Sequence, residues 1–409
     1  MKKLIQIAQD AVYFFAMSCV LFIPFPFHIF SSQAHITQFI WGKAISFTGQ
    51  QVFGIQSVNA EISSDSTNMY LLVFLLGITA LLFAIISALI RIWTKKRLDI
   101  LAIIRQILCY YLALMMFKYG FDKVFKAQFY LPEPNTLYTP MGHLSKDILF
   151  WSTMGTSYSY SVFGGVIEVM AGGLILFKRT RVLGLLLIIG VMLNVVAINF
   201  GFDISVKLYS LLLLLLALIL LAPQTVRMYE FFILQKESRL RVVPEAMPAF
   251  FNKKLRLLAQ ILLIGFLLLE ALYPYLITGN FNDDKFPRPY LHGAYEVRGV
   301  LLDNQTVALN TSPVRRFFIH LKGFMIFQNF EDQMQDYKLE VNQIQKKLTL
   351  TNYQSQKKYF QYTYLPKDSL LTLRFTEQKQ RITLKAKVLN WRDLPTTKSQ
   401  FHWTIEAVK

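Results

Sequence analysis

The sequence has few cysteines, and its histidines show no metal-ligand spacing. Its 409 residues include two cysteines, Cys19 and Cys109, and six scattered histidines. Both cysteines lie in apolar runs, and residues 278–409 contain none, so neither disulfides nor cysteine-bound metals are expected. No histidine lies within such a run, which excludes a haem held by two intramembrane histidines.

Charged residues are also scarce, at 17% of the chain against 54% hydrophobic residues. The average hides a division, because residues 1–277 form a series of apolar runs while residues 278–409 are polar and contain no such run. The first part requires a bilayer and the second requires water. Despite the net charge of +18, nucleic acid is not an expected partner, because no compact soluble basic region gathers the excess.

Seven apolar segments are long enough to cross a bilayer, which takes about 20 helical residues. They lie near 6–27, 69–92, 99–121, 157–177, 182–201, 205–222 and 256–277. A cleaved signal peptide is the alternative for 6–27, since Lys2 and Lys3 precede it, but no small-x-small cleavage site follows directly. We therefore expect four parts: 1–98 with two spans, a four-helix core at 99–222, a basic connection and seventh span at 223–277, and a β domain at 278–409.

The basic residues fix the expected orientation. Most of those in residues 1–277 lie before the first apolar segment or in every second connection between segments. These are Lys2, Lys3, Arg91, Lys95, Lys96, Arg97, Lys178, Arg179, Arg181, Arg227, Lys236, Arg239, Arg241, Lys253, Lys254 and Arg256. The connections on the other side of the membrane hold fewer, namely Lys43, Lys118, Lys123, Lys126, Lys146 and Lys207. Because basic residues accumulate on the cytoplasmic side, we expect a cytoplasmic N-terminus and a C-terminal domain in the periplasm or outside the cell.

Three connections are too long for simple turns. In 28–68, apolar residues recur at helical spacing over 36–47, which fits either a helix in the membrane interface or a packed loop. The segment 122–156 carries Pro132, Pro134 and Pro140 and cannot be one helix. The basic segment 223–255 contains a candidate interfacial helix at 229–234.

The C-terminal region shows the alternation of β-strands. Eight short runs are rich in aromatic and β-branched residues, at 295–302, 315–327, 337–341, 347–353, 358–364, 370–375, 381–389 and 401–407. They predict an antiparallel barrel or a sandwich. Gly293, Tyr295 and Glu296 resemble the start of a lipocalin strand, so a lipocalin-like barrel is one form. Such a barrel holds one small apolar ligand or packs its own side chains.

Ionisable residues inside apolar segments are costly and are therefore candidate sites. Glu168 lies mid-segment in GGVIEVMAGG, where glycines allow close helix approach. Asn194 lies at a similar depth in its own segment, and Arg105 lies about 10 Å in from the cytoplasmic end of its segment, judged by the helical rise. The three side chains could therefore converge. The alternatives are a structural tie between helices for Glu168 and an Arg105 that extends to the interface.

A second group of polar residues lies nearer the outer face: Lys118, Asp122, Asn199, Asp203 and Lys207. They are candidates for an outward-facing vestibule, and Asp203 and Lys207 have the spacing of a helical ion pair. Solvated helix ends are the alternative, and we prefer it for Lys123 and Lys126. Asp10 and Glu270, near helix ends, are weaker candidates.

Residues 99–222 resemble the DoxX family of four-helix bacterial membrane proteins. The likeness is carried by Arg105, KYGFDKVF (118–125), FGGVIEVMAGGLILF (163–177), KRTR (178–181) and VMLNVVAINF (191–200). Residues 1–277 resemble longer DoxX-like proteins at PFPF (24–27), SSDST (63–67), MGTSYSY (154–160) and FDISVKLYS (202–210). Some family members are membrane subunits of quinone-linked oxidoreductases. The resemblance implies a bacterial plasma membrane location and a link to quinone.

Three functions remain open. The first is a quinone-linked membrane subunit, in which Glu168 and Asn194 bind the polar head of a quinone or similar lipid. No flavin or nucleotide fingerprint is present, so any redox centre would be the quinone or a partner's cofactor. The second is a non-enzymatic scaffold or binding protein whose β domain captures a ligand or envelope partner. The third is a transporter of a lipophilic molecule.

The distribution of basic residues yields a test of orientation. A reporter active only outside the cytoplasm should function when fused after Lys409, and one active only inside should function after Lys96 or Arg181. Activity of the cytoplasmic reporter after Lys409 would contradict the arrangement with seven spans.

Overall fold

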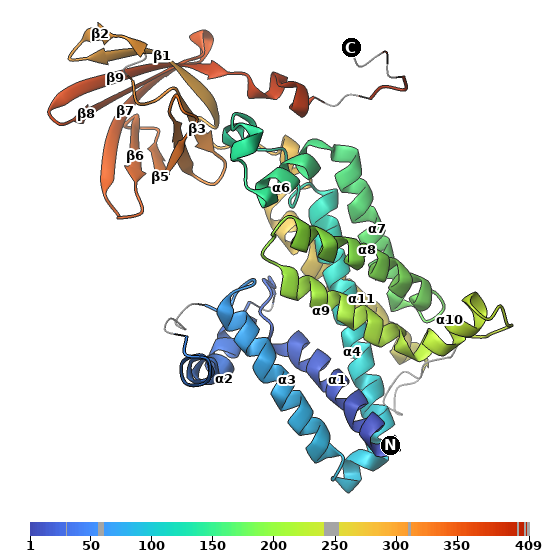
Figure 1. Cartoon of the computed structure of the whole chain (residues 1–409). Coiled ribbons are helices and arrows are strands. Elements are labelled where there is room, and N and C mark those ends of the chain that lie inside the picture. Colours follow the sequence, from blue (N-terminus) through green and yellow to red (C-terminus); the bar gives the residue numbers. More distant parts are fainter. Residues whose placement is uncertain are drawn as a thin grey trace. The chain divides into compact units, whose positions relative to one another are not determined.

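The structure is a computed structural model that describes residues 1–29, 31–55, 61–240, 253–309, 312–398, 401–404 and 406. The chain forms two compact units (Figure 1). Unit 1 comprises residues 1–128 and 162–281, and unit 2 comprises residues 129–161 and 282–409. The connection 129–161 between two long helices therefore belongs to the same unit as the C-terminal strands.

The described part of unit 1 is helical, and α7 begins in unit 2. Its elements are α1 (Lys2–Phe22), α2 (Gln33–Phe47), the π-helical turn η1 (Thr48–Val52), α3 (Thr67–Ser87), α4 (Arg91–Val124), α7 (Tyr158–Leu176), α8 (Arg181–Gly201), α9 (Lys207–Leu221), η3 (Ala222–Gln224), α10 (Thr225–Phe232) and α11 (Lys253–Thr278). Within the described residues, the segments long and apolar enough to cross a membrane number seven: α1, α3, α4, α7, α8, α9 and α11. The seven apolar segments expected from the sequence are thus confirmed as helices with the length and composition of the spans of a multi-pass membrane protein.

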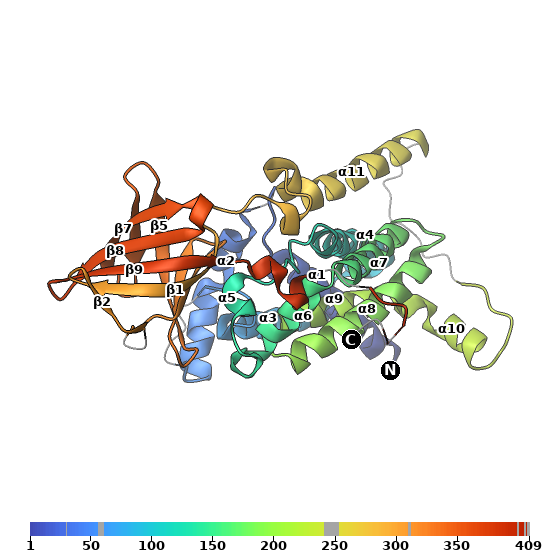
Figure 2. The ribbon, with the colours of Figure 1, turned by 90° about the horizontal axis from the view of Figure 1, so that it is seen from above.

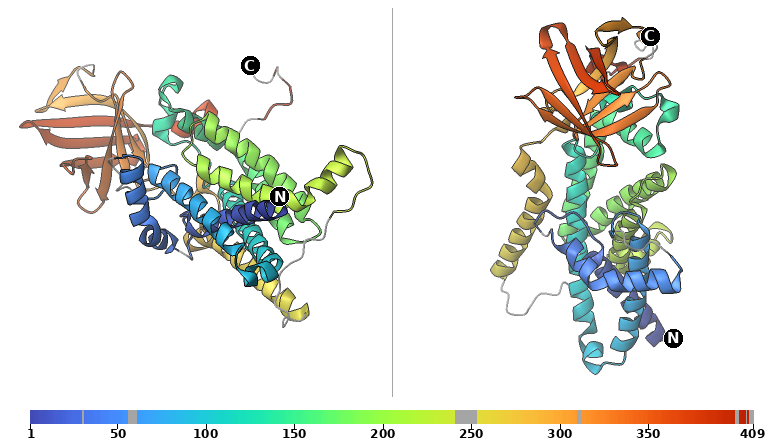
Figure 3. Two further views of the ribbon diagram at one scale, coloured as in Figure 1. Left: turned by 60° about the horizontal axis from the view of Figure 1, so that its bottom comes forward. Right: turned by 90° about the vertical axis from the view of Figure 1, so that its left-hand side faces the viewer.

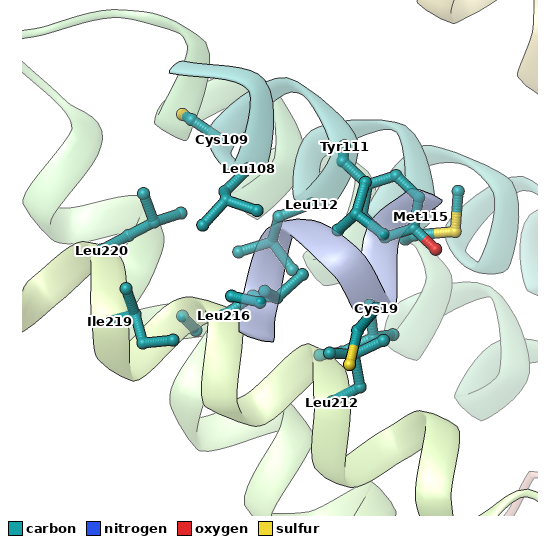
Figure 4. Close-up of a cluster of buried hydrophobic side chains, with 14 of the residues drawn as sticks. Cys19, Leu108, Cys109, Tyr111, Leu112, Met115, Leu212, Leu216, Ile219 and Leu220 are labelled. Atoms are coloured by element: carbon teal, nitrogen blue, oxygen red, sulfur yellow. The ribbon is translucent and has the colours of Figure 1, made fainter. Parts of the chain in front are cut away.

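The core of unit 1 is built around α4. Leu112 of α4 and Leu216 of α9 point toward one another, and Cys19 of α1 lies beside Leu212 (Figure 4). All four side chains are buried. α1 packs against both α3 and α4 (Figure 3), and α11 packs against α4. Between helices in a bilayer such close packing, rather than exclusion of water, supplies most of the attraction.

The helical alternative for 36–47 is the one observed. α2 covers it, yet Phe39 and Phe47 are 88% and 65% exposed. A helix that turns aromatic side chains outward suits the membrane interface expected for this segment. The expected helix at 229–234 is also present as α10, which begins earlier and ends at Phe232.

Unit 2 contains a closed antiparallel barrel, so the barrel is confirmed over the sandwich. Its strands are β1 (Gly293–Leu302), β3 (Arg316–His320), β4 (Phe324–Gln328), β5 (Met334–Asn342), β6 (Lys347–Thr351), β7 (Lys357–Leu365), β8 (Leu370–Glu377) and β9 (Gln380–Leu389). Consecutive strands pair, and β9 returns to lie beside β1 (Figure 2). The short β2 (Gln305–Val307) forms a hairpin with β1.

The remaining elements of unit 2 are short helices. They are α5 (Pro134–Leu137), η2 (Met141–His143), α6 (Lys146–Thr156), η4 (Asp283–Lys285), η6 (Pro366–Asp368), η7 (Trp391–Asp393) and η8 (Pro395–Thr397). As expected from its prolines, the connection at 122–156 is not one helix.

The barrel interior is filled by its own side chains, since Phe317, Leu348 and Leu371 are completely buried. Phe318, next to Phe317, points to the opposite face of its strand and is also completely buried. It packs against Tyr138, with 5.9 Å between the ring centroids. Residues 129–161 therefore cover an apolar patch on the outside of the barrel.

Two strand predictions are wrong. The run 315–327 is two strands, because the chain turns at 321–323, where Gly323 adopts a φ of +73°. The run 401–407 shows no strand in its described residues, 401–404 and 406. Its aromatic composition suits a strand, but the barrel is closed without it, because β1 and β9 already pair with each other.

Candidate functional site

The C-terminal end of α4 carries charged side chains that pair with other helices of unit 1. Lys118 Nζ lies 3.1 Å from Glu270 Oε1 of α11. The backbone N–H groups of His28 and Ile29 donate to the same carboxylate, each at 2.8 Å. Glu270 is 1% exposed and Lys118 is 7% exposed. A buried carboxylate with three donors is well compensated for its loss of water.

Glu168 forms the second pair. Lys123 Nζ of α4 lies 2.8 Å from Glu168 Oε2 of α7. The two helices touch at glycines, because a Cβ added at Gly165 would lie 2.5 Å from the carbonyl oxygen of Gly120. This close approach brings Lys123 within reach of a glutamate in the middle of α7.

The third contact joins α4 to α11 again. The hydroxyl of Tyr275 donates a hydrogen bond to Asp122 Oδ1. The Tyr275 ring packs on Phe125, with 4.7 Å between centroids, and Phe281 packs on Phe125 at 5.3 Å. Three residues in the last two turns of α4 therefore connect it to α7 and α11.

An aromatic cluster lies beside Lys118 and consists of Phe25, Phe27, Tyr111, Tyr119 and Tyr209. Phe25 stacks on Tyr209 at 5.3 Å between centroids, and the hydroxyls of Tyr111 and Tyr209 are 2.8 Å apart. Lys118 Nζ lies 5.6 Å from the Phe25 ring and 5.9 Å from that of Phe27. The phenylalanines of the PFPF segment thus provide cation–π contacts to the buried ammonium group.

The expected convergence of Glu168, Asn194 and Arg105 does not occur. Arg105 Nε donates to Tyr13 Oη at 2.7 Å. Asn194 is exposed on α8, and among the described residues no hydrogen bond joins it to the other two. Depth describes the position of a residue along its helix but not the direction in which its side chain points, and here the three directions differ.

The five vestibule candidates are divided between different contacts. Asp203 and Lys207 form the expected ion pair at 2.8 Å beside the start of α9. The backbone N–H groups of Lys207 and Leu208 donate to Asp65, which caps that helix. Asn199 is 4% exposed.

The preference for solvated helix ends at Lys123 and Lys126 is wrong. Lys123 is 8% exposed and Lys126 is completely buried. The sequence could not show this, because the partner of Lys123 lies 45 residues further along the chain. Asp10, the other weak candidate, is buried and paired with Arg97 at 2.7 Å, with Trp93 Nε1 donating at 3.1 Å.

Unit 2 has a buried polar contact that the sequence did not suggest. Glu133 directly precedes α5. Its Oε2 atom lies 2.9 Å from Nε2 of His292 and 4.0 Å from Nε2 of His320. The backbone N–H of Leu321 donates to the same oxygen at 3.0 Å. Burial raises the pKa of Glu133, but the hydrogen bonds from His292 and Leu321 outweigh it and hold the pKa below its usual value. Burial lowers the pKa of His320.

The barrel has a pocket of about 760 Å³ in its wall. It lies where β7 and β8 separate, because their pairing stops at Gln361 and Arg374 although β7 begins at Lys357 and β8 continues to Glu377. The lining residues are Asn304, Lys347, Lys357, Lys358, Tyr359, Phe360, Gln361, Arg374, Phe375, Thr376, Glu377, Arg381, Ile382 and Thr383. Within the described part of the chain, no cluster of histidine, cysteine, aspartate or glutamate has the geometry to hold a metal ion.

Comparison with known proteins places part of the chain in a family. No family model and no solved structure matches it. The uncharacterized protein YwoB of Bacillus subtilis is 34% identical over 120 residues, covering 27% of this chain and 70% of YwoB. This chain belongs to the same family as YwoB. Because YwoB is uncharacterized, the membership transfers no activity.

The ion pair between Lys123 and Glu168 predicts how a substitution of Glu168 affects the stability of the protein. Glu168→Gln removes the negative charge that lies 2.8 Å from a buried ammonium group, and loss of one partner from a buried pair costs about 3–5 kcal/mol. We expect a clear fall in the monodisperse fraction on size-exclusion chromatography. The double variant Lys123→Met/Glu168→Leu should recover most of it, because both charges are removed together.

Asp203→Asn is the matched control, since its side chain is 84% exposed. It should leave the monodisperse fraction unchanged. Equal loss in the single and double variants would show that the pair does not stabilise the contact between α4 and α7.

The contact of Glu133 predicts acid sensitivity of residues 129–161. The lowered pKa of His320 contributes stability at neutral pH that is lost as the pH falls below the unperturbed histidine value of about 6.5. The lowered pKa of Glu133 also contributes stability, which is lost only at a lower pH, below the unperturbed glutamate value of about 4.3. Hydrogen exchange in 129–161, corrected for its intrinsic pH dependence, should therefore rise from pH 7.5 to pH 5. Protection that is equal at both pH values would contradict this account.

Proposed function

We propose that this chain is a membrane-anchored binding protein whose β-barrel takes up a ligand outside the bilayer. The observation that carries the proposal is the pocket of about 760 Å³ at the separation of β7 and β8. Pockets of this size accommodate small organic molecules. The rest of the barrel is filled by its own side chains, so the pocket is a local opening rather than a general looseness of packing.

The helical unit serves as the anchor in this proposal. The buried carboxylates Glu168 and Glu270 have cationic partners within the unit, and Asp122 accepts a hydrogen bond from Tyr275. Such an arrangement stabilises helix contacts without a ligand. The basic residues favour a cytoplasmic N-terminus, with the barrel on the other side of a bacterial plasma membrane.

A quinone-linked role is the second candidate, and the aromatic cluster beside Lys118 favours it. Aromatic rings around a buried ammonium group offer stacking surfaces and a hydrogen-bond donor, which are features that a quinone head requires. A DoxX-like membrane subunit would use such a site with a redox partner protein.

Extraction of small molecules from the purified full-length protein tests the two candidates. Thr376→Trp/Gln361→Trp narrows the barrel pocket with two indole rings, and Gln335→Trp, on the exposed face of β5, is the matched control. We expect mass spectrometry to find a molecule that co-purifies with the wild type and with the control but not with the narrowed variant. A stoichiometric quinone that remains in the narrowed variant and is lost in Lys118→Met would instead support the second candidate and contradict the first.

A further inference from the structure

The separation of β7 and β8 divides one end of the barrel wall into two sheets. Residues 357–361 of β7 remain paired with β6, from Thr351↔Lys357 to Lys347↔Gln361. Residues 375–377 of β8 remain paired with β9, as in Phe375↔Ile382. The β6–β7 and β8–β9 hairpins accordingly run in different directions (Figure 1). At the opening, β7 and β8 each keep a regular pairing with their other neighbour, so the opening is part of the barrel's pairing pattern and not a local irregularity of either strand.

Aromatic side chains lie within this opening. The rings of Phe360 and Phe375 meet across it with 4.6 Å between centroids. Phe360 is 4% exposed, and Ile382 lines the same pocket. The opening thus leads from solvent to an apolar surface that belongs to the barrel interior.

The rim of the opening is strongly basic. Five cationic side chains line the pocket against one carboxylate, namely Lys347, Lys357, Lys358, Arg374 and Arg381 against Glu377. Glu377 pairs with Lys358 at 2.7 Å across the opening. Among the described residues, Lys357, Arg374 and Arg381 have no carboxylate within ion-pair distance.

The Lys358–Glu377 pair does not close the opening firmly. Its side chains are 53% and 46% exposed, and exposed pairs of this kind contribute little stability. A ligand with its own negative charge can replace Glu377 as the partner of Lys358.

We propose that the opening between β7 and β8 binds an anionic amphiphile, with its charged head on the basic rim and its apolar chain against Phe360 and Phe375. This inference rests on the proposed binding function and adds the place and the chemical class of the ligand. A phosphate or carboxylate head suits Arg374 and Arg381, because guanidinium groups bind such oxygens with paired hydrogen bonds. A neutral ligand would leave the three cations unpaired.

Octyl phosphate is the probe, titrated below its critical micelle concentration into the full-length protein in phosphatidylcholine nanodiscs. Calorimetry should show saturable binding after subtraction of empty nanodiscs. Inorganic phosphate, which lacks the chain, and octyl glucoside, which lacks the charge, should each bind at least about tenfold more weakly.

Lys357→Gln/Arg374→Gln should weaken octyl phosphate binding by about tenfold or more. Lys367→Gln is the matched control, because it lies in the connection at the other end of the same two strands and is exposed. It should leave binding unchanged, and both variants should unfold at the wild-type temperature.

A competition experiment identifies the source of the ligand. If phosphatidylglycerol vesicles compete with octyl phosphate, the ligand is a membrane lipid, and if they do not compete, it is a free amphiphile. Both results agree with the proposal.

Equal binding of inorganic phosphate and octyl phosphate would overturn the proposal, as would binding that the double variant leaves unchanged. If octyl phosphate does not bind while another co-purifying molecule is lost from the narrowed pocket, the ligand class is wrong and the binding function stands. If octyl phosphate does not bind and no molecule co-purifies, both are wrong.

Discussion

A charge buried between apolar helices must have a partner, and this constraint organises the helical unit. Lys118 and Lys123 extend from the end of α4, where neither water nor lipid tails can compensate an ammonium group. Their partners Glu270 and Glu168 come from α11 and α7, so satisfying the charges also fixes which helices pack on α4. Removal of one partner would take away the attraction that offsets the desolvation free energy of the other charge.

The barrel obeys a related constraint on apolar surface. Phe318 points to the outside of the barrel. On a barrel without further segments around it, this side chain would be exposed to water. Residues 129–161 cover it, and the buried contact of Glu133 with His292 holds the same segment. The connection between α4 and α7 is thus a structural part of the β unit, which explains its length.

The sequence predicts the elements well because their signals are local. Apolar runs and alternation are set by neighbours along the chain, and they identify the seven long apolar helices and most strands of the described residues. The site was harder, because a partner depends on rotation about the helix axis and on distant residues. Glu168 stands out in the sequence as a polar group in an apolar segment. Its partner Lys123 does not, because the pair depends on the close approach of α4 and α7 at Gly120 and Gly165.

The buried pairs have a further consequence for the connection between the two units. The chain passes between them after α4, at the start of α7 and after α11. These are the three helices that Lys123–Glu168, Lys118–Glu270 and Tyr275–Asp122 join. The charges therefore hold together the helices from which every passage into unit 2 departs.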